Sequence, residues 1–98
     1  MKVRFSRRAF RDLTEIADYI AVENPAAAAR TGAAIQKAID LLSRHPYVGV
    51  RNARAAEMRS WLVTPFPCRV HYRVRDDIVW IVHVRHTARR DWPGRERP

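Results

Sequence analysis

The sequence predicts an α+β domain in which one strand, two helices and three further strands follow one another along the chain. Two patterns with helical spacing occupy residues 6–44. Three strand patterns follow within residues 58–85, where apolar and polar side chains alternate. The chain has 98 residues, of which 47% are hydrophobic, and this is enough for one core between two layers. We therefore expect residues 1–98 to form a single domain, with a helix hairpin on one face of an antiparallel sheet.

The first strand and the first helix are predicted within residues 2–24. Lys2 to Phe5 alternates as a short strand does, and Ser6 then stands at the N-cap position of a helix. The apolar stripe of this helix is predicted to comprise Phe10, Leu13, Ala17 and Ile20. Its polar side carries Arg7, Arg11, Asp12, Glu15 and Asp18. An amphipathic helix that ends near Asn24 is the expected result.

The second helix is predicted to begin at Pro25, because proline suits the first helical position and Asn24 can serve as the N-cap. Pro46 ends it after His45. The alanines and Gly32 are small enough to let two helices approach closely, which favours a hairpin. The buried stripe of this helix is predicted to comprise Ile35, Ala38, Ile39 and Leu42.

Residues 47–57 have no clear period and are expected to form a loop. The three strands that follow are predicted at residues 58–63, 68–75 and 78–85. A two-residue turn at Asp76-Asp77 would pair Tyr72 with Ile81 and Arg73 with Trp80, whereas a three-residue turn would put Trp80 on the other face. The basic tail that begins at residue 86 is expected to be mobile from about residue 93.

The composition is strongly basic, with 19 Lys and Arg against 10 Asp and Glu, a net charge of +9 and a pI near 11.2. This excess is larger than solubility requires and favours an acidic macromolecular partner. Residues 49–98 contain 11 basic and 5 acidic residues, so the functional surface is expected there. Arginine suits bidentate contacts with phosphate or carboxylate, although a coding bias would explain the ratio of Arg to Lys equally well.

Several classes of function are disfavoured by what the sequence lacks. Cys68 is the only cysteine, which excludes an intramolecular disulfide and a cysteine-based metal site and favours the reducing cytoplasm. No apolar stretch approaches the ~20 residues of a membrane span, and the start has no signal-peptide pattern. The histidines lack metal-binding spacing, and no serine lies in a nucleophile elbow. We therefore expect no metal, no other cofactor and no membrane partner.

Two groups of basic side chains are candidate binding surfaces. The strand at 68–75 places Arg69, His71, Arg73 and Arg75 on one side, with Trp80 beside them in the expected register. This stripe suits phosphates or an acidic helix, although an ordinary solvated strand has the same pattern. The second group lies in RHTARRDW and comprises Arg85, His86, Arg89, Arg90 and Trp92. It could hold a phosphate or stack a base, or it could be a basic tail whose Trp92 packs on the core.

Four segments in this order resemble the RelE/ParE superfamily of bacterial type II toxins. They are VRFSRRAFRDLTEIADYI, LLSRHPYVG, RVHYRVRDD and IVWIVHVRHTARRDW. The resemblance implies the fold described above and a toxin that is neutralised by an acidic antitoxin, whose C-terminal segment wraps it. It also implies one of two targets, because RelE-like members are ribosome-dependent mRNA endonucleases and ParE-like members act on DNA gyrase.

The resemblance to the nuclease branch is incomplete at its catalytic positions. Arg69 and Arg89 fall where RelE-like nucleases keep two catalytic arginines. Ser60 and Leu62, however, stand where those nucleases keep lysines, and Arg95 stands where they keep a late tyrosine. A cleft that activates a 2′-hydroxyl and stabilises a phosphorane would therefore lack several of its groups. If the chain were a nuclease, its candidate catalytic residues would be Arg69, His86 and Arg89.

The resemblance favours the ParE branch, on the Asn24-Pro25 break, the HPYVG helix exit and the HxxRRDW ending. It implies a toxin that is not an enzyme, inhibits DNA gyrase and binds a ParD-like antitoxin, with an endonuclease acting on ribosomes and mRNA as the alternative. A plain nucleic-acid-binding module would share the charge but would not explain the family segments. The predicted target-binding residues are Arg69, Arg85, His86, Arg89, Arg90 and Trp92. The predicted antitoxin-binding residues are Arg73, Arg75 and Trp80.

Overall fold

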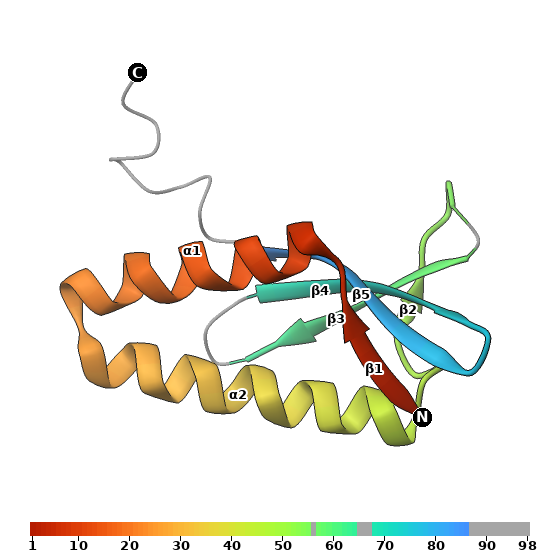
Figure 1. The fold of residues 1–98 in the computed structure, drawn as a ribbon, viewed down its shortest axis with the longest axis horizontal. Helices are drawn as coiled ribbons and strands as arrows, with labels where there is room; N and C mark the ends of the chain where they lie inside the picture. The colour runs from red at the N-terminus through yellow and green to blue at the C-terminus, as the bar shows by residue number, and fades with distance from the viewer. Residues whose placement is uncertain (56, 65–67, 87–98) are drawn as a thin grey trace.

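The computed structural model of the protein describes residues 1–55, 57–64 and 68–86, which form two helices and a five-stranded sheet (Figure 1). Residues 87–98 of the predicted tail, with Arg89, Arg90, Trp92 and Arg95, lie outside the described residues. The elements are β1 (Lys2–Phe5), α1 (Arg7–Glu23), α2 (Pro25–Arg44), β2 (Val50–Arg51), β3 (Met58–Val63), β4 (Cys68–Arg75) and β5 (Ile78–His86). None of the helices formed by the described residues is long and apolar enough to span a membrane.

The helix hairpin forms where the capping residues predicted it. The Ser6 hydroxyl accepts a hydrogen bond from the Ala9 amide at 3.0 Å and so begins α1. Asn24 has two roles, because its backbone N–H donates to the carbonyl of Ile20 while its side chain accepts from the Ala27 amide at 3.0 Å. The same residue therefore closes α1 and opens α2, and the chain reverses within one residue.

The sheet has the strand order β1-β5-β4-β3-β2. The central strands are antiparallel in the predicted register, with Tyr72 opposite Ile81 and Arg73 opposite Trp80. The predicted fold class is confirmed, but the sheet is not antiparallel throughout, because β1 pairs with β5 in parallel, along residues 2–5 and 78–81. The expectation of a loop at residues 47–57 also missed β2, which is only two residues long and carries no readable alternation.

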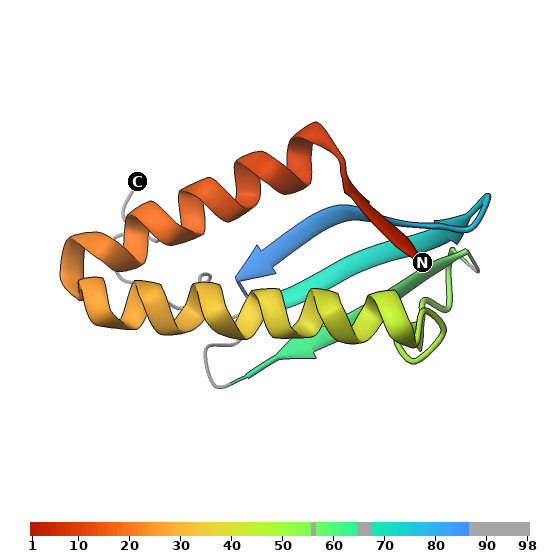
Figure 2. The same ribbon diagram turned by 60° about the horizontal axis from the view of Figure 1, so that its bottom comes forward.

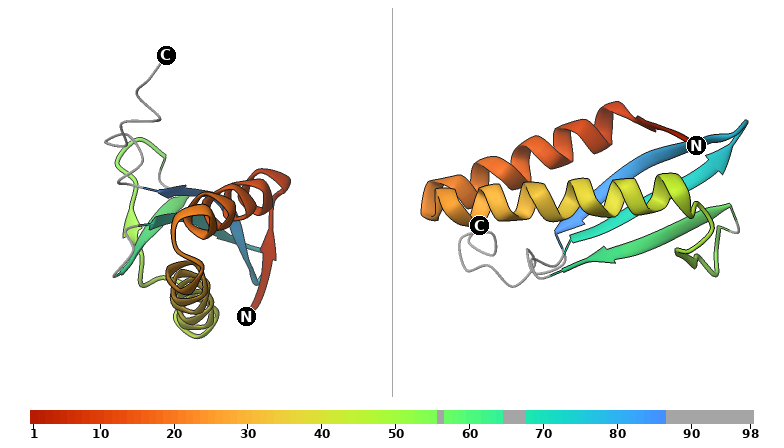
Figure 3. Two further views of the ribbon diagram at one scale, coloured as in Figure 1. Left: turned by 90° about the vertical axis from the view of Figure 1, so that its left-hand side faces the viewer. Right: turned by 90° about the horizontal axis from the view of Figure 1, so that it is seen from below.

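Both helices lie on the same side of the sheet (Figures 2 and 3). The stripe predicted for α2 is buried, whereas the stripe predicted for α1 is turned by about one residue. Phe10 is 68% exposed, and Ala9 and Ile16 are buried instead. Hydrogen bonds from Ser6 to the Ile81 and Val82 carbonyls fix the rotation of α1 against β5, which sequence periodicity could not indicate.

The buried Tyr72 ties the segment that follows α2 to the sheet. Its hydroxyl accepts a hydrogen bond from the Gly49 amide at 2.9 Å and donates one to the Pro46 carbonyl at 2.8 Å. Burial raises the pKa of the Tyr72 hydroxyl above its ordinary value. A fully buried hydroxyl with both bonds satisfied holds this segment in one position against β4.

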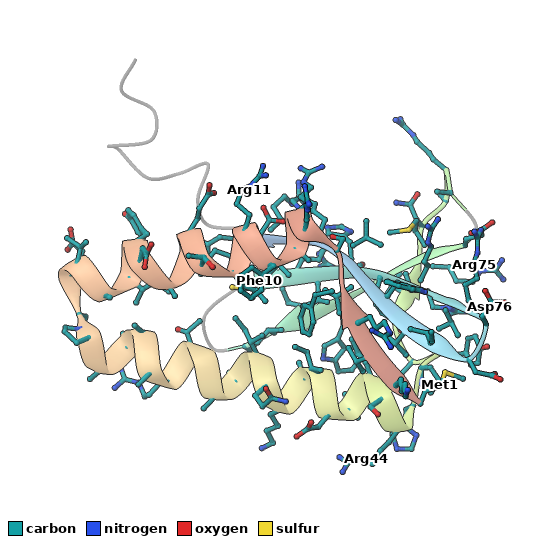
Figure 4. The ribbon with its side chains drawn as sticks, viewed as in Figure 1. Met1, Phe10, Arg11, Arg44, Arg75 and Asp76 are labelled. Atoms are coloured by element: carbon teal, nitrogen blue, oxygen red, sulfur yellow. The ribbon has the colours of Figure 1, made fainter. Side chains whose placement is uncertain are left out.

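The turn between β4 and β5 holds two residues in the left-handed region. Asp76 has φ 54° and Asp77 has φ 62°, as in a type I′ hairpin turn. Figure 4 shows Arg75 and Asp76 at this end of the sheet. The two-residue turn sets the register between β4 and β5. This register decides which of their side chains lie on each face of the sheet.

We expect Asp77→Gly to raise the free energy of unfolding by up to about 1 kcal/mol, because glycine adopts positive φ without steric cost. Chemical denaturation of the two proteins measures this difference. Asp40→Gly is the matched control, since it removes an aspartate from the interior of α2 and should destabilise by about 1 kcal/mol. An unchanged or lower stability of Asp77→Gly would contradict the assignment of the turn.

Candidate functional site on the open face of the sheet

The face of the sheet opposite the helices is the candidate functional site, and we name it the open face. In β4 the buried Cys68, Val70 and Tyr72 point toward the helices, so Arg69, His71 and Arg73 point away from them. No helix of the described residues lies on this side (Figure 3). The open face comprises Ser60 and Leu62 of β3, Arg69, His71 and Arg73 of β4, and Trp80, His83 and Arg85 of β5.

A β-bulge in β5 brings His83 and Arg85 onto the open face. His71 lies opposite His83 while Tyr72 lies opposite Ile81, so Val82 is the extra residue. The alternation of β5 therefore changes after Val82, and Val84 is buried on the helix side while Arg85 is exposed. The Ser6 hydroxyl donates to the Val82 carbonyl at 2.7 Å, which anchors the bulge to the start of α1.

His83 is oriented by a carboxylate from α1. Nδ1 of His83 lies 2.6 Å from Oδ2 of Asp12, and the same oxygen accepts a hydrogen bond from the Val84 amide at 3.0 Å. An ionised Asp12 accepts the Nδ1 proton, which leaves Nε2 of His83 as the ring nitrogen that can act on a ligand. The His83 ring stacks on the ring of His71, with centroids 5.4 Å apart and planes 14° from parallel.

Two arginines flank this histidine pair on the neighbouring rung of the sheet. Arg69 lies opposite Arg85 in the register of β4 and β5. The guanidinium of Arg69 is held by a hydrogen bond to the Ser60 hydroxyl at 2.9 Å. Two arginines on neighbouring strands attract an anion, and phosphate and carboxylate are the groups that guanidinium binds best.

His71 is neutral at physiological pH. Its pKa falls from the ordinary 6.5 to about 4, mainly because the ring is partly buried. Electrostatic interactions with His83, Arg85, Arg69 and Arg8 lower the pKa further. The open face therefore presents one imidazole without charge among several cations, a combination that can bind an anion and accept a proton.

The predicted antitoxin-binding arginines occupy the other end of the open face. Glu57 accepts a hydrogen bond from Arg75 at 2.8 Å and lies 3.8 Å from Arg73. These side chains are about half exposed, so their pairing adds little to stability and leaves them available to a partner. Trp80 lies opposite Arg73, as the register predicted.

Residues 3–91 match the family model described as the ParE toxin of the type II toxin-antitoxin system, parDE. The chain belongs to this family. Its curated relatives include Toxin RelE2 of Caulobacter vibrioides, which is 39% identical over 90% of this chain and 97% of its own length. Another is the putative toxin Y4kP of Sinorhizobium fredii, which is 37% identical over 94% of this chain and 93% of its own length.

Two solved structures share the fold of this toxin. The chromosomal ParDE toxin-antitoxin system of P. aeruginosa superposes with a TM-score of 0.75 at 21% identity, over 88% of this chain and 95% of that chain. The toxin-antitoxin complex RelBE2 of Mycobacterium tuberculosis superposes with a TM-score of 0.60 at 31% identity, over 87% and 95% respectively. The chain is a type II toxin of the RelE/ParE superfamily, and its relatives carry names from both branches.

Three of the residues that the family resemblance singled out, Ser60, Leu62 and Arg69, lie together at one end of the open face. Ser60 lies opposite His71, and Leu62 lies opposite Arg69. The positions where RelE-like nucleases keep lysines therefore adjoin the arginine pair, but in this toxin they carry a hydroxyl and an isobutyl group. Imidazole rings, rather than lysines, supply the titratable groups here.

His86, which was predicted among the target-binding residues, does not lie on the open face. Its side chain is only 2% exposed, because the bulge puts it on the helix side together with Val84. His86 lies opposite the buried Cys68, whose thiol pKa burial raises to about 11, so neither group faces a ligand on the open face. The other predicted residues in the described part of the chain, Arg69, Arg73, Arg75, Trp80 and Arg85, belong to strands β4 and β5 as expected.

Sequence reasoning missed the roles of Asp12 and His83. The sequence pattern places Asp12 on the polar side of a helix, and His83 is one of the histidines that lack metal-binding spacing. A weak signal was present, because Arg8 and Asp12 are one helical turn apart and so face the same neighbour. That this neighbour is β5 depends on the tertiary packing of α1.

Proposed function

We propose that this toxin inhibits DNA gyrase through its open face in the cytoplasm, and that a ParD-like antitoxin with an acidic segment neutralises it. The observation that carries the proposal is the pair Ser60 and Leu62 beside Arg69, where a RelE-like nuclease would need lysines. Leu62 is 42% exposed, so this end of the open face suits contact with a protein better than contact with a phosphate. The match of residues 3–91 to the ParE family supports the same target.

An antitoxin as partner is supported by the charge of the toxin and by its structural relatives. The net charge of +9 favours an acidic binding segment. The M. tuberculosis relative was solved as a toxin-antitoxin complex. A small domain gains apparent stability from any ligand that binds only its folded state, so the antitoxin should raise the melting temperature of the toxin.

The second candidate function is cleavage of mRNA on the ribosome, and the histidine pair is the observation that favours it. His71 could accept the proton of a 2′-hydroxyl, whose oxygen then attacks the adjacent phosphorus. Arg69 and Arg85 would stabilise the phosphorane, and the bond to the 5′-oxygen would break. A protonated His83, oriented by Asp12, would donate its Nε2 proton to that oxygen, leaving a 2′,3′-cyclic phosphate and a 5′-hydroxyl.

The two candidates predict different responses to single substitutions on the open face. For a gyrase inhibitor, Arg69→Ala and His71→Ala should each weaken inhibition by about threefold to tenfold, because contact surfaces lose affinity in graded steps. For a nuclease, either change should reduce cleavage by about 100-fold or more while binding survives. Arg54→Ala, an exposed side chain outside the open face, is the control.

The measurements are supercoiling by purified gyrase and the integrity of ribosome-bound mRNA, each with wild-type toxin and the three variants. Inhibited supercoiling with intact mRNA is the result we expect. Cleaved mRNA together with undisturbed supercoiling would replace the gyrase proposal by the nuclease.

A further inference from the structure

A pocket lies between the two helices, on the side of the sheet opposite the open face. α1 and α2 diverge from the reversal at Asn24 (Figures 2 and 3), and residues of both helices line the pocket. Its volume is about 270 Å³. The walls are mainly apolar, with Leu13 and Ile16 on α1, Ile35 and Ile39 on α2, and Phe5 at the end of β1. An apolar pocket between packed helices is a common place for a small molecule to bind.

Two small residues leave this space open. Ala17 lines the pocket from α1, and Gly32 lines it from α2. Apart from chain neighbours and the backbone of its own helix, a Cβ atom at Gly32 would meet nothing within 4 Å. Glycine in a helix interior is less stable than alanine, so Gly32 keeps the pocket open while it weakens α2.

The pocket also contains a buried hydroxyl group. Thr31 lines it and is only 5% exposed. Within the described part of the chain its hydroxyl has no hydrogen-bond partner, whereas the Thr14 hydroxyl of α1 donates to the Phe10 carbonyl. Gln36, which also lines the pocket, donates its side-chain amide to Asp40 at 3.2 Å and keeps its carbonyl oxygen as an acceptor. Because buried polar groups are normally hydrogen-bonded, the Thr31 hydroxyl is a group that a ligand would satisfy.

We propose that this pocket binds a small uncharged aromatic molecule that carries one hydrogen-bonding group. An apolar cavity of about 150 Å³ accepts a single benzene ring, so the larger volume here suits two fused rings. The polar group of the ligand would bind the Thr31 hydroxyl or the Gln36 carbonyl oxygen. None of the described residues that line the pocket is charged, so a charged ligand would lose its hydration without gaining an ion pair.

Other occupants fit this pocket less well. An acidic protein segment or a nucleic acid would find its ionic partners among the arginines of the open face, on the other side of the sheet. A second copy of this chain carries the same charge of +9 and would be repelled. A small neutral molecule meets neither obstacle.

The test uses the whole toxin with indole, and with indene as a probe of the same shape that has no N–H group. We expect indole to bind with a dissociation constant of roughly 0.1–1 mM and to shift the backbone amide signals of Thr31 and Gly32 in NMR spectra. Thr31→Val keeps the shape of the side chain but removes the hydroxyl. It should weaken binding of indole about threefold to tenfold and leave binding of indene within about twofold.

A second pair of variants tests the location of the site. Gly32→Leu should fill the pocket and weaken binding of indole about tenfold or more. Ala33→Leu is the matched control, because residue 33 is the next position of α2, is exposed and does not line the pocket, so binding should change by less than about twofold. Leucine is a good helix former, so both variants should fold.

Three results would overturn the proposal. They are equal binding of indole by the two leucine variants, unshifted Thr31 and Gly32 signals at saturating indole, and amide shifts that depend on toxin concentration without indole. The last result would assign the pocket to a second copy of the chain. The gyrase assay depends on the open face instead, so either result can fail while the other stands.

Discussion

Gly49→Ala is expected to lower the free energy of unfolding by about 2–4 kcal/mol. A Cβ atom at this position would lie 2.5 Å from the hydroxyl oxygen of Tyr72 and 2.9 Å from the backbone carbonyl oxygen of Ser60. Neither neighbour can move easily, because Tyr72 is fully buried and its hydroxyl is bonded to Pro46. The methyl group must therefore push β4 away from the segment that follows α2, and the bond from the Gly49 amide is lost with it.

The chain offers a matched control for this experiment. Gly32 lies inside α2, and apart from its chain neighbours and the backbone of its own helix, a Cβ atom there would meet nothing within 4 Å. Gly32→Ala should therefore raise the free energy of unfolding by up to about 1 kcal/mol, since alanine is the better helix former. Urea denaturation of both variants measures the contrast. Equal effects of the two substitutions would mean that Tyr72 does not hold this segment as described.

A loss of stability in acid, traceable to His71, is the second large effect that we expect. The pKa of His71 is about 4 in the folded protein and the ordinary 6.5 when unfolded, so the unfolded chain binds the proton more tightly. The resulting stabilisation is complete above pH 6.5 and is lost progressively as the pH falls toward 4. Because the ring is partly solvated, we expect a loss of about 1–2 kcal/mol rather than the full value of the shift.

His71→Gln isolates this contribution, because glutamine is polar and of similar length but does not titrate. Urea denaturation at pH 7 and near pH 4 should show a smaller decrease in stability for the variant than for the wild type. The substitution leaves the pairing of His83 with Asp12 in place, so the two proteins differ only at residue 71. A variant that is as acid-sensitive as the wild type would locate the titrating group elsewhere.

The sequence predicted the elements that depend on local chemistry. Asn24 and Pro25 marked the helix reversal because capping involves neighbours only three residues away. Asp76 and Asp77 fixed the hairpin register for the same reason, and the register in turn placed Arg73 opposite Trp80. The basic side chains of β4, which form about half of the candidate site, could be predicted because every second residue of a strand lies on the same face.

The remainder of the site depended on packing between distant segments. The bulge at Val82 cannot be recognised in the sequence of β5, because valine is also common in regular strands. Without it, His83 would be assigned to the helix side and His86 to the open face, the reverse of the structure. Asp12 could not be joined to His83 either, since 71 residues separate them and only the rotation of α1 brings them together.

The parallel pairing of β1 with β5 has a consequence for the way the chain is made. Residues 2–5 are synthesised more than 70 residues before their partners at 78–81. The nascent chain can form its helix hairpin early, whereas the sheet closes only after a contact that spans most of the chain. An mRNA broken before codon 78 should therefore yield a fragment without a closed sheet and without the β5 residues of the open face.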